Sequence, residues 1–310
     1  MITRILEKKN CPNVMASVPS SLPNWTGLLG WSTTYHDGTN PTKFGAMDEE
    51  RKKWLETALN SAFGGQEDPN QVMKKAVQEI SEGRVSAGLD LLDYASDFLD
   101  CAENFGKIGG LECVINLLKD ENPELVKRAM EILTAYLPNN ARLQLEASLK
   151  HDCLNQLKMV ITSHPMNRET VAGAVSVIGS LIRNVTVLES SFIRDGGVEF
   201  LSELVTTDSD QRLTLKIVSL FFFLASRHDL TSKASIFNGN IRSIYTSESI
   251  DQTDIQFWET VSNFISLVNI SKDTGICISK RIQWVSSLEA EAAADYNEEI
   301  AMLRLIVANR

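Results

Sequence analysis

The chain has 310 residues, 43% of them hydrophobic, so it is long enough to bury a large core in one or two domains. Its formal net charge is −10, and the whole acidic excess lies after residue 80, because residues 1–80 hold equal numbers of basic and acidic side chains. This charge argues against nucleic acid or an anionic membrane as a partner and favours a partner with basic patches.

The start of the chain and its cysteines indicate where the protein works. The first residues, MITRILEKKNCPN, carry charge without a long apolar segment, so they do not predict a secretory signal. No apolar run reaches the roughly 20 residues that span a bilayer. Five scattered cysteines without a CxxC pair are typical of reduced thiols. We therefore expect a cytoplasmic protein with no membrane contact.

Residues 1–46 are predicted to form a flexible N-terminal arm, and residues 47–310 a helical cap followed by a repeat domain. The arm contains the stretch GLLGWSTTYHDGTNP, in which Leu28, Leu29 and Trp31 stand among Gly, Ser and Thr. A linker does not need such large apolar side chains. Either Trp31 packs back on the cap helix beside Trp54, or the three side chains are exposed anchors for a partner.

Two helical segments precede the repeats. The stretch VMKKAVQEI, at 72–80, predicts a helix that caps the N-terminal end of the domain. The next stretch, LDLLDYASDFLDCAENF, reads as a single helix on which Asp90, Asp93, Asp97 and Asp100 form one stripe. The stripe is either an acidic ridge for a basic partner or an ordinary solvated helix face.

An internal repeat dominates the rest of the sequence. The segments EILTAYLPNN, SVIGSLIRNV, SLFFFLASRH and SNFISLVNIS start 45, 43 and 43 residues apart. Second apolar helices accompany them, in LECVINLL, LNQLKMVI, VEFLSELV and IRSIYTS, at spacings of 43, 44 and 43. A period near 43 with two or three helices per unit is typical of armadillo or HEAT solenoids. We therefore predict an all-α solenoid of about four repeats, closed by an amphipathic helix at 295–310.

Cap residues mark the predicted helix boundaries at the same period. Polar residues that favour the N-cap position precede the long helices, the last of them with Gln256 three residues later as a capping box. Paired glycines in KIGGLE and RDGGVE are expected where one helix ends and the next turns away. The predicted caps are Asn122, Asn167, Asp210 and Thr253, and the paired glycines are Gly109, Gly110, Gly196 and Gly197.

Polar residues recur where the long helix of each repeat ends. Asn139, Arg183, Asn184 and Arg227 fall in or beside one column of the repeat alignment, as does Asn269. Armadillo proteins commonly line a concave groove with polar side chains at this position. The column is either a ladder for a partner or a set of side chains that satisfy exposed helix-end carbonyls.

The sequence offers little for catalysis. His36-Asp37, His151-Asp152 and His228-Asp229 suggest a metal-dependent hydrolase, but they fall in a loop and at corners of different repeats. Asp and His at helix ends are also ordinary caps. The sequence shows no Gly-rich phosphate loop and no nucleophile elbow. We expect a protein that is not an enzyme, with no cofactor and no metal.

Two regions resemble the cytosolic nucleotide-exchange factors of the seventy-kilodalton heat-shock chaperones, the family of heat-shock-protein-binding protein one. The first is LLGWSTTYHDGTNPTKFGAMDEERKKWLETAL, and the second is the repeat array, with FLDCAENFGKIGGL and AVSVIGSLIRN. The resemblance covers about residues 24–230. This chain departs from the family pattern at Cys101, where the family has Asn, and at Pro138-Asn139, where the family often has Gln-Asn.

The resemblance implies a co-chaperone that binds the chaperone's ATPase domain and accelerates ADP release, as a monomer. It implies that the arm, with Leu28, Leu29 and Trp31, acts near the chaperone's peptide-binding domain and aids substrate release. The alternative is a generic armadillo adaptor that binds an extended peptide in its groove. The contact residues predicted on this basis are Asp93, Asp97, Asp100, Asn104, Asn139, Arg183, Asn184 and Arg227.

Overall fold

The computed structural model describes residues 49–63, 68–288 and 293–308, and in these ranges every regular element is a helix. The chain divides into two compact units between Asp68 and Pro69. In the first unit, the structure describes helix α2 (Glu49–Phe63). The predicted arm at residues 1–46 lies outside the described residues, so its boundary stays a prediction. No helix among the described residues is long and apolar enough to cross a membrane.

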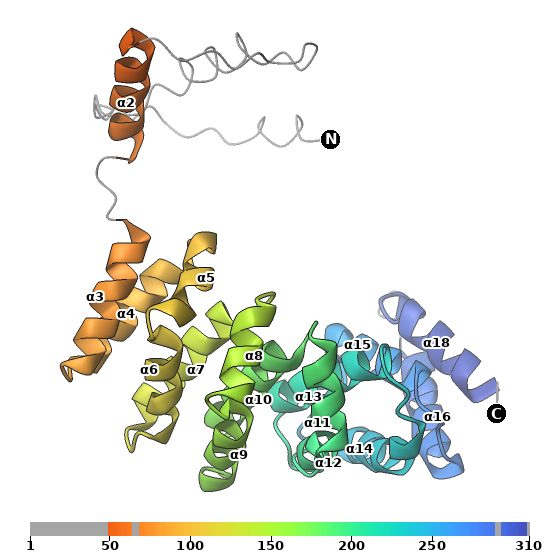
Figure 1. Cartoon of the computed structure of the whole chain (residues 1–310). Coiled ribbons are helices and arrows are strands. Elements are labelled where there is room, and N and C mark those ends of the chain that lie inside the picture. Colours follow the sequence, from red (N-terminus) through yellow and green to blue (C-terminus); the bar gives the residue numbers. More distant parts are fainter. Residues whose placement is uncertain (1–48, 64–67, 289–292, 309–310) are drawn as a thin grey trace, which may run out of the picture. The chain divides into compact units, whose positions relative to one another are not determined.

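The second unit is a stack of helical repeats, which confirms the predicted all-α solenoid (Figure 1). Long helices begin at 123, 168, 211 and 255, close to the spacing in the sequence. Its helices are α3 (Pro69–Ser81), α4 (Val85–Ser96), α5 (Leu99–Lys107), α6 (Gly110–Asn116), η1 (Leu117–Lys119), α7 (Pro123–Tyr136), α8 (Ala141–Leu149), α9 (Cys153–Ser163), α10 (Arg168–Ile182), α11 (Thr186–Arg194), α12 (Gly197–Ser202), α13 (Gln211–Ala225), η2 (Thr231–Lys233), α14 (Ala234–Thr246), α15 (Ile255–Ser266), α16 (Lys272–Ser286) and α18 (Asn297–Ala308).

One row of helices runs through all the repeats. Successive contacts join α4 to α7, α7 to α10, α10 to α13, α13 to α15 and α15 to α18. A single hydrophobic core, from Met73 to Leu303, connects this row with the shorter helices behind it. Each repeat therefore buries its apolar face against its neighbours, as a solenoid requires.

The N-caps of the long helices follow the sequence in three of four cases. The side-chain oxygens of Asn122, Asn167 and Asp210 accept hydrogen bonds from backbone N–H groups in the first turns of α7, α10 and α13. The predicted cap Thr253 is wrong, because Asp254 accepts from the backbone N–H of Phe257 at 3.0 Å. The Thr253 hydroxyl instead donates to Asp251 at 2.7 Å.

The paired glycines make the turns that the sequence predicts. Gly109 and Gly196 have φ angles of 81° and 78° in the left-handed region, where a side chain is strained. Each immediately precedes a short helix, α6 or α12. The second glycine of each pair is held tightly, since a Cβ on Gly197 would lie 2.4 Å from the ring of Phe192.

The predicted single helix with four aspartates is wrong, because the chain breaks between α4 and α5. Phe98 is extended, with φ −107° and ψ 115°. On one continuous helix of about 3.6 residues per turn, Cys101 and Phe105 would lie well away from the face of Leu89 and Leu92. The break allows all four side chains to be buried in the same core.

Helix α18 closes the C-terminal end, as predicted, by packing on α15 and α16. Its Glu299 receives two hydrogen bonds from Arg281, at 2.9 and 3.1 Å, and both side chains are almost fully buried. The Arg281 guanidinium also lies over the rings of Trp258 and Trp284, 4.2 and 4.5 Å from their centroids. The ion pair therefore fixes the last helix on the solenoid.

Candidate partner-binding groove

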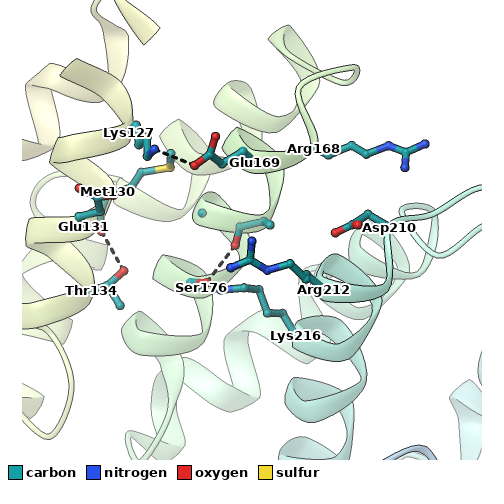
Figure 2. A pocket seen from close by; sticks show the side chains of 12 residues that line it. Lys127, Met130, Glu131, Thr134, Arg168, Glu169, Ser176, Asp210, Arg212 and Lys216 are labelled. Atoms are coloured by element: carbon teal, nitrogen blue, oxygen red, sulfur yellow. Dashed lines mark hydrogen bonds and ion pairs between the residues drawn. The ribbon is translucent and has the colours of Figure 1, made fainter. Parts of the chain in front are cut away.

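A hollow of the repeat unit lies where α10 faces its neighbours α7 and α13 (Figure 2). It has a volume of about 640 Å³. Small residues of α10, among them Ala172, Gly173 and Ser176, line it. At Gly173 a Cβ would come within 3.0 Å of the Met130 side chain on α7, so the absence of a side chain there keeps the hollow open.

Charged side chains surround this hollow from three helices (Figure 2). Lys127 on α7 pairs with Glu169 on α10 at 2.7 Å. Arg168 donates to the backbone carbonyl of Asp208 at 3.1 Å. Lys216 on α13 donates to the Ser176 hydroxyl.

Arg212 has no hydrogen-bond or ion-pair partner in the described part of the chain. The pKa of Lys216 is lowered by burial and by the charge of Arg212.

A second hollow, of about 520 Å³, continues from the first and shares Thr134, Ser176 and Lys216 with it. Asn139, Arg183 and Asn184 line it, so the structure brings together three of the four predicted column residues. We call the two hollows together the groove.

The two asparagines of the groove follow the ends of α7 and α10 and have an unusual backbone conformation. Asn139 and Asn184 have φ angles of 59° and 67°, in the left-handed region that Asn tolerates better than most residues. The Asn184 amide donates to the Asn139 side-chain oxygen at 3.4 Å across the two repeats. Asn139 and Asn184 therefore follow the ends of their helices and also line the groove, and their role as a ladder for a partner stays a prediction.

Arg183 is the most constrained charged group of the groove. Its guanidinium lies over the ring of Phe223 at 5.2 Å, and its backbone carbonyl accepts from the buried Gln144 amide at 2.8 Å. Burial lowers its pKa. Its Nε is buried beside Gly179 and has no hydrogen-bond partner in the described part of the chain.

Arg227, the fourth column residue, does not line either hollow. The Arg227 guanidinium lies 5.4 Å from the centroid of the Phe223 ring, and the Arg183 guanidinium contacts the same ring. The Nε of Arg227 donates to the fully buried Glu189 at 3.1 Å, and His228 contacts the same carboxylate oxygen at 2.7 Å. The Arg227 side chain is therefore bound mainly to other groups of this protein.

The predicted acidic ridge is divided by the break between α4 and α5. Asp93 and Asp97 are exposed, Asp90 pairs with Arg128 at 2.6 Å, and the side chain of Asp100 lies outside the described residues. The Asn104 amide donates to Asn70 at 2.9 Å, and its oxygen accepts from Lys107 at 3.1 Å. Asn104 therefore joins α5 to α3, and the ridge stays a predicted contact surface.

The remaining sequence predictions fall outside the groove. Leu28, Leu29, Trp31 and His36 lie outside the described residues. His151-Asp152 stands at the turn before α9, and no group of three or more possible metal ligands forms in the part of the chain that the structure describes. Sequence reasoning missed Arg168, Arg212 and Lys216. Arg168 and Arg212 fall in the first turns of α10 and α13, and Lys216 lies one turn after Arg212.

With this geometry in view, comparison with known proteins places the chain. The family model described as the SIL1/FES1/HPBP1 C-terminal domain matches residues 101–263, more than half of the chain and the part that forms the groove. The chain belongs to the SIL1/FES1/HPBP1 family. This confirms the family that the sequence resembles.

Individual members of the SIL1/FES1/HPBP1 family are only distantly similar. The nucleotide exchange factor SIL1 of Mus musculus is 26% identical over 59% of this chain and 39% of its own length. The Hsp70 nucleotide exchange factor FES1 of Kluyveromyces lactis is 21% identical over 78% of this chain and 86% of its own length. The matched part of this chain spans about two fifths of the SIL1 relatives.

Solved structures agree with the fold of this SIL1/FES1/HPBP1 member. A designed armadillo repeat protein in complex with the peptide (KR)4 covers 74% of this chain and 99% of its own, with a TM-score of 0.52 and 13% identity. An engineered protein covers 79% of this chain and 100% of its own, with a TM-score of 0.58 and 14% identity. At these identities the likeness supports the armadillo-like fold alone.

Proposed function

We propose that this protein is a nucleotide-exchange co-chaperone of a seventy-kilodalton heat-shock chaperone. Its family includes relatives named nucleotide exchange factor SIL1 and Hsp70 nucleotide exchange factor FES1, which supports this assignment. The single observation that carries the proposal is the groove, which lies inside the family-matched region. The protein acts by binding and needs no catalytic group of its own.

The proposed mechanism is thermodynamic linkage. The groove binds one lobe of the chaperone's ATPase domain and favours its open form over the closed, ADP-bound form. A coupling free energy of about 2–3 kcal/mol would weaken ADP binding about 30- to 150-fold. The weakened complex then loses ADP faster, and ATP replaces it.

Arg183, Asn139 and Asn184 are the proposed contacts in the groove. Arg183 is held in place by Phe223 and by the Gln144 bond to its carbonyl, so binding a partner there costs little side-chain entropy. Arg227 contributes by supporting Phe223. Asp93, Asp97, Asp100 and Asn104 form a second proposed contact surface, with the acidic residues available to basic groups of the chaperone.

Three further parts of the proposal concern the whole chain. The N-terminal arm, with Leu28, Leu29 and Trp31, acts near the chaperone's peptide-binding domain and aids substrate release. The protein works as a monomer in the cytoplasm. Cys113, Cys153 and Cys277 are free thiols, which is consistent with a reducing compartment.

Release of fluorescent ADP from a chaperone ATPase domain tests the proposal. The domain is preloaded, then chased with ATP in a stopped-flow instrument with and without this protein. Release should accelerate with protein concentration, and Arg183→Ala should reduce the acceleration at least about tenfold while the circular dichroism spectrum is unchanged. The matched control is Arg194→Ala, which removes an exposed arginine that pairs only with its neighbours Asp195 and Ser191.

A generic peptide-binding adaptor is the second candidate, favoured by the structural likeness to a designed armadillo protein in complex with a peptide. If the protein fails to accelerate ADP release from several cytosolic chaperones, the adaptor function takes first place. If Arg183→Ala and Arg194→Ala accelerate release equally, the groove is not the contact surface.

A further inference from the structure

The groove has the opposite charge to the rest of the chain. Its basic lining residues outnumber its acidic ones, although the whole chain has a net charge of −10. Lys127 and Glu169 neutralise each other, and Asp210 is used as the N-cap of α13. The basic residues are Lys127, Arg168, Arg183, Arg212 and Lys216, and the acidic ones are Glu131, Glu169 and Asp210.

The basic side chains of α13 are one turn apart and reach toward α10 (Figure 2). The guanidinium of Arg212 has no hydrogen-bond or ion-pair partner among the described residues. Lys216 is exposed on the same side, and partial desolvation of its amine together with the charge of Arg212 lowers its pKa. Glu169 attracts Arg212 through space but is already paired with Lys127. Arg212 and Lys216 therefore still repel each other, and a bound anion would relieve this repulsion.

We propose that the centre of the groove recognises an acidic segment of a partner protein, with Arg212 and Lys216 as the residues that select for its carboxylates and Arg183 as a further donor. The inference rests on the proposed function in that it names the chemistry of the chaperone surface that the groove binds. The net acidity of the sequence favours a basic partner, but the structure locates that acidity outside the groove.

Two observations favour a short acidic protein segment over a nucleic acid and over a basic peptide. The basic residues span only α7, α10 and α13, while exposed Asp93 and Asp97 stand on the preceding repeat. A nucleic acid that continued along the solenoid would meet these acidic side chains and be repelled. The net charge of the groove lining is positive, so it would repel a basic peptide such as (KR)4, with which the similar designed protein is complexed.

A charge-reversal pair and a matched control test the inference. Arg212→Glu/Lys216→Glu reverses the two cations of the groove. Lys280→Glu/Arg304→Glu makes the same change of residue types and net charge at exposed positions of α16 and α18 outside it. The probe is a fluorescent peptide of alternating Glu and Ala, and its binding is followed by anisotropy at several salt concentrations, together with binding of the chaperone ATPase domain.

The groove reversal should weaken binding of the acidic peptide and of the ATPase domain at least about tenfold, while the control changes each less than about twofold. The affinity of Arg212→Gln/Lys216→Gln for both ligands should lie between those of the reversal and the control. A graded loss of this kind indicates lost electrostatic attraction and not misfolding. Equal binding by the reversal and the control would overturn the inference, as would tighter binding of an oligonucleotide or full competition by inorganic phosphate. If the peptide binds as expected but wild-type protein never accelerates ADP release, the proposed function falls and the acidic-partner inference stands.

Discussion

Cys153 shows how the environment of one residue controls its chemistry. It begins α9 with its side chain fully buried, and burial raises the pKa of its thiol from 9.0 to about 12. The folded state therefore favours the protonated thiol. This contribution to stability is fully present below pH 9, where the unfolded thiol is also protonated, and is lost as the pH rises from 9 to 12.

We predict that Cys153→Ala makes the free energy of unfolding less sensitive to alkaline pH. Urea unfolding at several values between pH 8 and pH 11 measures this, with the slope of the wild type steeper than that of the variant. In native protein the Cys153 thiol should also resist alkylation until urea unfolds the chain. Parallel stability curves for wild type and variant would show that the buried thiol is not the group responsible.

At the residue scale, the column at the helix ends was predictable and the basic centre of the groove was not. Asn139, Arg183 and Asn184 recur with the repeat, so an alignment of the sequence with itself finds them. Arg212 and Lys216 have no equivalent cations at Glu169 and Gly173 of the preceding repeat. They line the same hollow as residues of α7 and α10, which only the packing of α13 on α10 establishes.

At the scale of elements, α18 depends on one buried ion pair. Glu299→Gln should destabilise the protein by about 3–5 kcal/mol, because it leaves the buried Arg281 guanidinium without its counter-charge. In a solenoid each repeat contacts only its neighbours, so hydrogen exchange should increase first in α16 and α18 and least in α7–α10.

The control is Asp273→Asn, which removes the exposed partner of Arg242, 3.8 Å away, and should cost less than about 1 kcal/mol. Equal losses of stability in the two variants, measured by urea unfolding, would mean that the Arg281–Glu299 pair does not hold α18 in place.

The helices themselves were largely predictable, because capping and periodicity are local properties. The errors also have local causes. Asp254 replaces Thr253 as a cap because the Thr253 hydroxyl is bound to Asp251. The aspartates keep a helical period from Asp90 to Asp100, which suggests one helix. Cys101 and Phe105 share a core with Leu89 and Leu92 only because the chain bends at Phe98.

For the whole molecule, the net charge does not describe the groove, whose basic lining residues outnumber its acidic ones. A sum over 310 residues averages the basic centre of the groove with an acidic exterior, and a partner experiences the local field near the contact. The family and the repeat fold were recoverable from the sequence because both depend on patterns that recur along the chain.

We propose that this protein binds the open, nucleotide-free ATPase domain better than the closed, ADP-bound one. Calorimetric titration of the protein into the ATPase domain, with and without saturating ADP, tests it most directly. Binding should be weaker with ADP by about 30- to 150-fold, and ADP affinity should fall by the same factor when the protein is saturating, because the thermodynamic cycle must close. Equal affinities for the two forms would contradict the account, since a partner that binds both states alike cannot promote ADP release.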